Sequence, residues 1–382
     1  MKKILILGGS HRDIPLIKAA QELGYYVITL GAREYYLGHK YSDKYYLIDF
    51  NDLDVVKKIY IKENIDYLLP GCGEQSYLNT VKLSHQLHIG NFDTLEIAQL
   101  IHDKWQFKEF CLANKISTPK GTFYHKKFAL DALKLPIVVK PTNLSGGRGI
   151  KVVHTIADLK TALSEAKKYS NEIFLEEFIE GELFAYSVFF INKKIIYDFF
   201  GKDDMYLNPY LVTTAYPAKI ENRLLQILKD ELEVMARTLD IVDGMFHAQV
   251  IMKNKKLYII DVTRRIPGDF YPNLIEFCDN IAYSKAVVQS YTTGKVTVAL
   301  QKSQQYFVIR HCVMPSQNGL YTNIFIDETL KDKIIYRFDL MPLNSLIENY
   351  LYTQIAIVFI KLDKSDFKIC DNIHTLIYPI LT

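Results

Sequence analysis

The stretch LPIVVKPTNLSGGRGIKVV, residues 135–153, joins a lysine at the end of an apolar run to a glycine-rich turn. Lys140 follows Pro136–Val139, and the turn after it contains Ser145, Gly146, Gly147, Arg148 and Gly149. Glycine tolerates positive φ and lets backbone N–H groups approach a phosphate closely. In a P-loop the lysine follows the glycines and a helix begins there, whereas here the lysine comes first and a β-prone run follows. The pattern predicts either a strand–loop–strand flap over a triphosphate or a glycine-rich hairpin with a surface lysine.

Two adjacent glutamates interrupt a second β-prone segment, IFLEEFIEGELFAYSVFF. A carboxylate at Glu176 or Glu177 can accept a hydrogen bond from the exocyclic amine of adenine. Backbone groups near Phe178 and Ile179 can pair with the rest of the base edge, and Glu182 can accept from a ribose hydroxyl. The alternative is a strand with a solvated acidic face.

A predicted hairpin, FHAQVIMKNKKLYIIDVTRR, brings a third set of side chains together. Its turn lies midway between Gln249 and Asp261, so these two residues should face each other across the strands. Asp261 and Thr263 are two residues apart and point to the same face. Burial of a carboxylate inside an apolar strand costs free energy unless the carboxylate is paired or binds a metal. Oxygen-only ligands suit magnesium, and the alternative is an Asp261 that pairs with Arg264 or Arg265.

The elements that must position these residues divide the chain into three. Its 382 residues predict about two or three domains. Strand and helix signals alternate over residues 1–95, as in a parallel sheet covered on both faces. Ser10 and Asp13 stand where a dinucleotide fingerprint has glycines, which disfavours a Rossmann-type oxidoreductase. Hairpin signals dominate after residue 190, and one short helix is expected over Asn344–Tyr350.

Composition excludes several classes of protein. The net charge is only +3, from 46 basic and 43 acidic residues, which argues against a nucleic-acid partner. The five cysteines form no CxxC pair, as is typical of a reducing compartment. The N-terminal apolar run is too short for a signal peptide, and no run of about 18 apolar residues predicts a membrane span. We therefore expect a cytoplasmic protein with no membrane partner.

The three motifs, in this order and at this spacing, resemble the ATP-grasp superfamily of ligases, in particular single-grasp members similar to biotin carboxylase and carbamoyl phosphate synthetase. The resemblance implies an α/β protein in three parts. Residues 1–95 would form the parallel-sheet preATP-grasp domain. Residues 96–300 would form the α+β ATP-grasp domain that binds nucleotide and magnesium, and residues 301–382 a small β-rich C-terminal domain.

The resemblance also implies a role for each motif residue. ATP would contact Lys104, Lys140, Ser145, Gly146, Gly147, Gly149, Glu176, Glu177, Ile179 and Glu182. The catalytic residues would be Lys140, Arg148 and Arg265, and the magnesium ligands Gln249, Asp261 and Thr263. One or two Mg²⁺ ions are expected, with Mn²⁺ as an alternative, because Gln249 and Thr263 replace a carboxylate and an amide of the family pattern.

The implied reaction is that of an ATP-dependent carboxylate–amine ligase, which forms an acyl phosphate and releases ADP and phosphate. Its partners would be a small carboxylic acid and an amine, and a homodimer is allowed because biotin carboxylase-like relatives often dimerise. Two alternatives stay open: activation of bicarbonate, as in carboxylases and carbamoyl phosphate synthetase, and an ATP-binding sensor or scaffold without turnover.

Overall fold

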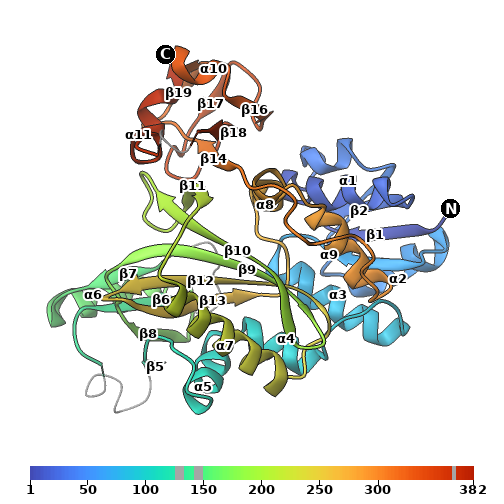
Figure 1. The fold of residues 1–382 in the computed structure, drawn as a ribbon, viewed down its shortest axis with the longest axis horizontal. Helices are drawn as coiled ribbons and strands as arrows, with labels where there is room; N and C mark the ends of the chain where they lie inside the picture. Colours follow the sequence, from blue (N-terminus) through green and yellow to red (C-terminus); the bar gives the residue numbers. More distant parts are fainter. Residues whose placement is uncertain (125–132, 142–148, 364–366) are drawn as a thin grey trace.

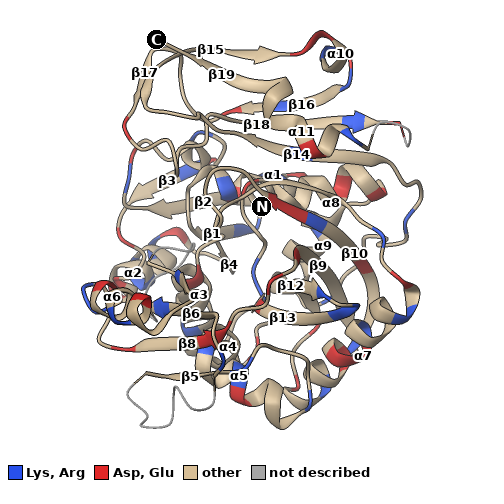
Figure 2. Ribbon diagram, turned by 90° about the vertical axis from the view of Figure 1, so that its left-hand side faces the viewer, with Lys and Arg blue, Asp and Glu red and all other residues tan. Residues whose placement is uncertain are grey.

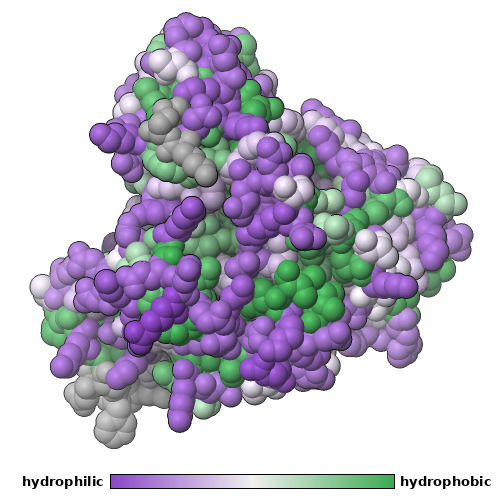
Figure 3. All heavy atoms as spheres, viewed as in Figure 1, coloured by the Kyte–Doolittle hydropathy of each residue, from purple (hydrophilic) through white to green (hydrophobic). Residues whose placement is uncertain are grey.

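Figure 1 shows the computed structural model of the chain, which describes residues 1–124, 133–141, 149–363 and 367–382. Within these residues the strands form four sheets, one parallel and three antiparallel. The N-terminal part lies beside the grasp sheets, and the C-terminal part projects as a separate lobe (Figures 1 and 3). Figure 2 shows basic and acidic residues interspersed over most of the described elements.

The N-terminal domain is built on a parallel sheet in the order β3-β2-β1-β4. Adjacent residues of β1 face opposite sides, so Ile4 packs with α1 and the late helix α9, while Leu5 packs with α2 and α3. Both faces are therefore covered, as expected for a parallel sheet. The bounds are β1 Lys3–Leu7, α1 Ile14–Glu22, β2 Tyr26–Gly31, β3 Lys44–Leu47, α2 Leu53–Glu63, β4 Tyr67–Pro70 and α3 Glu74–Leu87, with short 3₁₀ turns His11–Asp13 and Leu37–Lys40.

The helical stretch that follows is two helices, α4 (Leu95–His102) and α5 (Lys104–Ala113). They meet at Asp103, whose carboxylate accepts hydrogen bonds from the backbone N–H groups of Trp105 and Gln106. This N-cap begins the second helix and fixes the position of Lys104 on its first turn.

A small antiparallel sheet in the order β5-β8-β6-β7 comes next. Helix α6 covers it with an apolar face that includes Leu159 and Leu163. The antiparallel pairing of β6 with β7 confirms that the two β-prone runs on either side of the predicted flap are neighbouring strands. The bounds are β5 Gly121–Phe123, β6 Ile137–Pro141, β7 Lys151–Val153, α6 Ile156–Ala166 and β8 Ile173–Glu177.

A large sheet in the order β13-β12-β9-β10-β11-β14-β18-β16 connects the grasp to the C-terminal part. Strands from before and after residue 300 thus share one sheet, and the domain boundary placed there stays a prediction. Helix α7 packs on the grasp half. The bounds are β9 Glu182–Ile191, β10 Lys194–Met205, β11 Val212–Pro217, α7 Asn222–Thr238, β12 Gly244–Lys253, β13 Lys256–Thr263, β14 Phe307–Val313, β16 Ile334–Asp339 and β18 Ala356–Leu362.

The C-terminal lobe adds a sheet in the order β17-β15-β19. The helix expected over Asn344–Tyr350 is wrong, because Ser345–Ile347 form β17 and pair with β15. Ile347 is buried while Leu346 is exposed, so the segment follows the two-residue period of a strand. The bounds are β15 Gly319–Ile326, α10 Glu328–Lys331, β17 Ser345–Ile347, α11 Ile369–Leu376 and β19 Ile377–Leu381.

Two helices follow the hairpin, α8 (Tyr271–Asp279) and α9 (Tyr283–Thr292). Helix α9 packs against the N-terminal domain beside α1, whereas α8 packs against α9 and strands β11 and β14 (Figure 1). A buried ion pair strengthens this junction, because Arg264 Nε lies 2.7 Å from a carboxylate oxygen of Asp93. Among the described residues, no helix combines the length and the apolar character needed to span a bilayer.

Candidate active site

Lys140 is the last residue but one of strand β6, and its side chain belongs to a buried cluster of charges. Its Nζ lies 2.8 Å from Glu176 Oε1 on the neighbouring strand β8. The Nζ of Lys108, on α5, lies 2.9 Å from the other oxygen, Glu176 Oε2. Glu176 is only 3% exposed and Lys108 only 2%, so one carboxylate holds two ammonium groups almost out of water. Burial alone would raise the pKa of Glu176, but the two lysines hold it below its ordinary value.

This cluster changes the interpretation of the glutamate pair. A solvated acidic face is wrong for Glu176, because the residue is buried and both of its oxygens accept from lysines. Glu177 is half-buried, and its backbone N–H donates to the carbonyl oxygen of Lys120. Ile179, two residues further along the chain, is buried. Glu182 is exposed and pairs with Lys202. Contacts of these residues with adenine and ribose stay predictions.

The predicted flap lies mostly outside the described residues. Ser145, Gly146, Gly147 and Arg148 belong to that undescribed segment, so their roles stay predictions. Gly149 is described and has φ 72°, a left-handed conformation that a residue with a Cβ adopts only with strain.

The hairpin β12–β13 places the predicted magnesium ligands on one face. Gln249 lies opposite Asp261, as expected, and His247 lies opposite Thr263 in the next row of the same face. Asp261 is exposed, contrary to the expectation of a costly buried acid, and its carboxylate is therefore accessible. Arg264 does not pair with Asp261, because its guanidinium is buried against Asp93.

Arg265, the predicted catalytic arginine, adjoins these ligands. Its backbone N–H donates to Thr263 Oγ1, while its side-chain Nε is buried and bonds to no partner among the described residues. Burial, and then the nearby Arg265, lower the pKa of His247 to about 3, so this imidazole is neutral at physiological pH. An arginine with an unused donor beside an accessible carboxylate suits a ligand that carries phosphate and metal together.

The donor set fits one magnesium ion held jointly with a nucleotide. Asp261, Gln249 and Thr263 offer a carboxylate, a carbonyl and a hydroxyl, all of them oxygen donors of the kind that Mg²⁺ prefers. No metal-binding group of three or more His, Cys, Asp or Glu side chains is present in the part of the chain that the structure describes. Phosphate oxygens and water would therefore have to complete the coordination shell.

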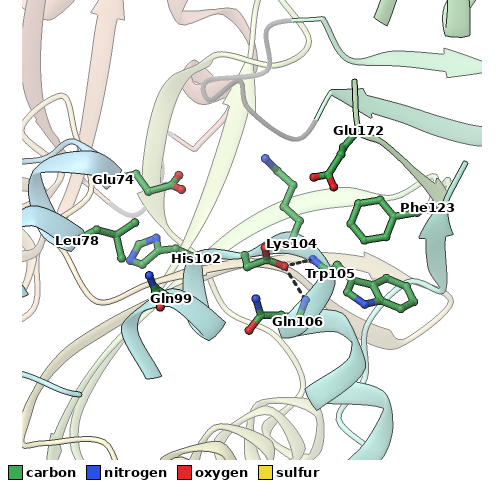
Figure 4. A pocket seen from close by; sticks show the side chains of 10 residues that line it. Glu74, Leu78, Gln99, His102, Lys104, Trp105, Gln106, Phe123 and Glu172 are labelled. Carbon is green, nitrogen blue, oxygen red and sulfur yellow. Dashed lines mark hydrogen bonds between the residues drawn. The ribbon is translucent and has the colours of Figure 1, made fainter. Parts of the chain in front are cut away.

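A cleft of about 370 Å³ lies beside these groups, lined by Glu74, Leu78, Gln99, His102, Asp103, Lys104, Trp105, Gln106, Phe123 and Glu172. Figure 4 shows Lys104 extending from α5 into this space, with Glu74 on one side and Glu172 on the other. Burial raises the pKa of Glu74, and the charges that act on it include Lys104, Asp261 and Arg265. A carboxylate of the N-terminal domain thus lies within electrostatic range of Asp261, one of the candidate metal ligands.

A second cleft, of about 540 Å³, lies in the N-terminal domain at the carboxyl ends of β1 and β4. The strand order reverses between these two strands, and such a switch point is the usual ligand site of an open parallel sheet. Asp13 fixes both surrounding loops, because its carboxylate accepts from the backbone N–H groups of Ser10 and Cys72. Tyr352 and Gln354 of the C-terminal lobe also line the cleft.

Sequence reasoning missed Lys108 and Glu74. Lys108 lies one turn beyond Lys104 on the same helix, and residues four apart share a helix face. This spacing could have identified Lys108 as a second candidate lysine. Glu74 follows the loop after β4, and the carboxyl end of a parallel strand is where such a residue is expected.

Comparison with known proteins shows which proteins this chain is similar to. Residues 133–273 match the model of the ATP-grasp domain. The formate-dependent phosphoribosylglycinamide formyltransferase of Methanococcus maripaludis is 26% identical over 342 residues, which cover 85% of this chain and 78% of the relative. The large chain of carbamoyl phosphate synthase of Clostridium perfringens is 25% identical over 59% of this chain and 22% of its own length.

Two solved structures share the whole fold. The L-amino acid ligase of Bacillus licheniformis superposes with a TM-score of 0.83 at 17% identity, over 100% of this chain and 99% of the other. The phosphoribosylglycinamide synthetase of Anaerococcus prevotii superposes with a TM-score of 0.77 at 20% identity, over the full length of both chains. Residues 133–273 are therefore identified as an ATP-grasp domain, and the chain as a whole is similar in sequence and fold to enzymes that contain this domain.

Proposed function

We propose that this enzyme is an ATP-dependent carboxylate–amine ligase that forms an acyl phosphate and releases ADP and phosphate. The observation that carries the proposal is the Lys108–Glu176–Lys140 cluster. Its carboxylate holds the ammonium group of Lys140 in place near the end of strand β6. A rigidly held ammonium group can stabilise charge on a transferring phosphoryl group without reorganising at the moment of reaction.

Two chemical steps follow from this assignment. A carboxylate oxygen of the acid attacks the γ-phosphorus of ATP, and ADP leaves. The amine nitrogen then attacks the acyl carbon, inorganic phosphate leaves with that carboxylate oxygen, and the nitrogen loses a proton. Arg265, whose Nε has no described partner, would hold the acyl phosphate. A magnesium ion on Asp261, Gln249 and Thr263 would supply charge neutralisation.

Glu74 is our candidate acceptor for the proton of the amine. Burial raises the pKa of its carboxyl group, which brings a carboxylate closer to the range of an effective general base. Its position in the cleft with Lys104 supports an acceptor site between the N-terminal domain and the grasp. We further propose a cytoplasmic location, because the enzyme would depend on cellular ATP.

Bicarbonate activation is the second candidate. The structural similarity to the biotin carboxylase domain of Hydrogenobacter thermophilus, with a TM-score of 0.76 over 94% of this chain, supports it. An ATP-binding scaffold without turnover is the third, since Gln249 is neutral where a carboxylate is expected.

ADP release separates the three candidates. Purified enzyme with ATP and Mg²⁺ would be assayed against pooled carboxylic acids, pooled amines, both pools together, and bicarbonate alone. The ligase predicts turnover that requires both pools and is lost in Asp261→Asn, while ATP binding measured by calorimetry persists. Turnover with bicarbonate alone would replace the ligase by the carboxylase, and ATP binding without ADP release from any mixture would favour the scaffold.

A further inference from the structure

The loop between β13 and α8 carries Arg265, and ion pairs hold it at both of its ends. At its first residue, the guanidinium of Arg264 is buried against Asp93. At its other end, just before α8, the carboxylate of Asp269 makes three contacts with side chains from distant parts of the chain. Arg265 lies between these two fixed points.

The carboxylate of Asp269 connects the loop to both ends of the chain. Its Oδ1 accepts a hydrogen bond from Arg12 Nε at 3.0 Å and lies 3.3 Å from His11 Nε2, and both of these residues precede α1. Its Oδ2 accepts from the side-chain amide of Gln354, in the C-terminal lobe, at 3.1 Å. One carboxylate therefore joins the grasp, the N-terminal domain and the C-terminal lobe.

The backbone of the loop adopts a conformation that depends on its surroundings. Asp269 and Phe270 have φ of 53° and 56°, in the left-handed region that residues with a Cβ rarely adopt. The carbonyl oxygen of Asp269 accepts from Arg310 Nη1 on β14 at 3.1 Å. The ring of Phe270 packs on that of Phe338 on β16, with centroids 4.9 Å apart. Contacts with other elements, rather than local preference, thus hold this turn in place.

The carboxylate of Asp269 is charged at physiological pH. Burial alone would raise its pKa, but the guanidinium of Arg12 and the imidazole of His11 hold the pKa well below its ordinary value. The contacts of Asp269 with Arg12 and His11 are therefore those of an ionised carboxylate.

Arg265 depends on the loop for its position. Its Nε is buried without a partner among the described residues, and its Nη1 donates to the carbonyl oxygen of Ile266 within the same loop. Its backbone N–H donates to Thr263 Oγ1 at the end of β13. The guanidinium therefore moves with the loop that carries it.

We propose that Asp269 is a positioning residue, which sets the β13–α8 loop so that the guanidinium of Arg265 meets the phosphoryl group in transfer. This inference rests on the role of Arg265 in the proposed function. Because Asp269 contacts the N-terminal domain and the C-terminal lobe, Arg265 is in place when all three parts are packed together. A donor that is placed in advance stabilises developing charge most effectively.

Asp269→Asn tests the proposal, because asparagine tolerates the left-handed conformation and the substitution removes the charge alone. The probe is ADP with Mg²⁺ and aluminium fluoride, which mimics a phosphoryl group in transfer and requires neither the acid nor the amine. Calorimetry would compare its affinity with that of ADP and Mg²⁺ alone. Asp269→Asn should reduce the gain in affinity from aluminium fluoride by roughly tenfold or more and leave the affinity for ADP alone unchanged.

A double-mutant cycle shows whether Asp269 acts through the arginine. Arg265→Lys keeps the charge but loses the guanidinium, and it should also reduce the gain. Adding Asp269→Asn to Arg265→Lys should reduce the gain no further, whereas additive losses would overturn the proposal. Gln354→Leu removes the contact with the C-terminal lobe without changing a charge, and it should reduce the gain to a smaller extent.

The matched control for stability is Asp279→Asn, at the other end of α8. Its carboxylate is also buried, and it contacts Lys302 at 3.3 Å and the hydroxyl of Tyr197 at 2.7 Å. This variant should lower the thermal midpoint and keep the full gain from aluminium fluoride.

Three results would overturn the proposal. They are a wild-type enzyme that gains no affinity from aluminium fluoride, an Asp269→Asn enzyme that keeps the full gain, and one that binds ADP alone as weakly as it binds the fluoride complex. The pooled assay of ADP release tests the ligase separately. An enzyme that shows the expected gains but turns over no mixture would refute the proposed function and leave the role of Asp269 intact.

Discussion

Replacing Glu176 by Gln should damage both stability and ATP binding. The substitution keeps the shape of the side chain but removes the charge that holds Lys108 and Lys140 at 2.9 and 2.8 Å. Two ammonium groups about 4–6 Å apart repel by about 3–4 kcal/mol at an effective dielectric constant of 20. Loss of one partner from a buried ionic cluster costs about 3–5 kcal/mol, so the two figures agree.

Calorimetry would measure both the thermal midpoint and the affinity for ATP. We expect a lower midpoint and a weaker affinity, because the Lys140 ammonium loses its anchor. Adding Lys108→Met to Glu176→Gln should recover part of the loss, since the repulsion disappears. Glu165→Gln is the matched control, because its pair with Lys151 is exposed on the same domain and should matter little. A Glu176→Gln enzyme with wild-type midpoint and affinity would refute the reasoning.

The remaining predictions concern buried acids away from the nucleotide. Asp93→Asn leaves the buried guanidinium of Arg264 uncompensated and should cost about 3–5 kcal/mol, seen as a lower thermal midpoint with unchanged ATP affinity; an unchanged midpoint would count against it. Burial raises the pKa of Glu276 from its ordinary 4.5 to about 7. The folded state then holds a proton that the unfolded state has lost, so stability falls as pH rises through this window. Glu276→Gln should flatten a pH series of thermal midpoints, and an unaltered slope would show that another group titrates.

The fold could be predicted from the sequence where periodicity and capping agree. The alternating signals of residues 1–95 predicted the parallel sheet, and in the structure Asp52 caps α2 by accepting a hydrogen bond from the backbone N–H of Val55. No prediction was possible where the order of elements along the chain differs from their order in space. Helix α9 packs beside α1, although more than half of the chain separates them, and β14 extends a sheet begun by β9. Local patterns carry no information on such long-range pairing.

The residue types of the candidate site could be predicted from the sequence, but the contacts between their side chains could be predicted only in part. The position of Gln249 opposite Asp261 follows from counting along a hairpin, and the structure confirms it. The partner of Glu176 could not be counted in this way, because Lys108 belongs to a helix some seventy residues earlier. The packing of α5 against β5 brings Lys108 to Glu176, while the contact of Glu176 with adenine stays a prediction.

Isotope transfer tests the central claim most directly. Once the pooled assay has identified the acid, its carboxylate would be labelled with ¹⁸O and the phosphate released with ADP analysed by mass spectrometry. An acyl phosphate intermediate predicts one ¹⁸O atom in each phosphate, because the oxygen that attacks the γ-phosphorus leaves with it. Phosphate free of ¹⁸O would contradict the account, since ATP would then be cleaved without activating the acid.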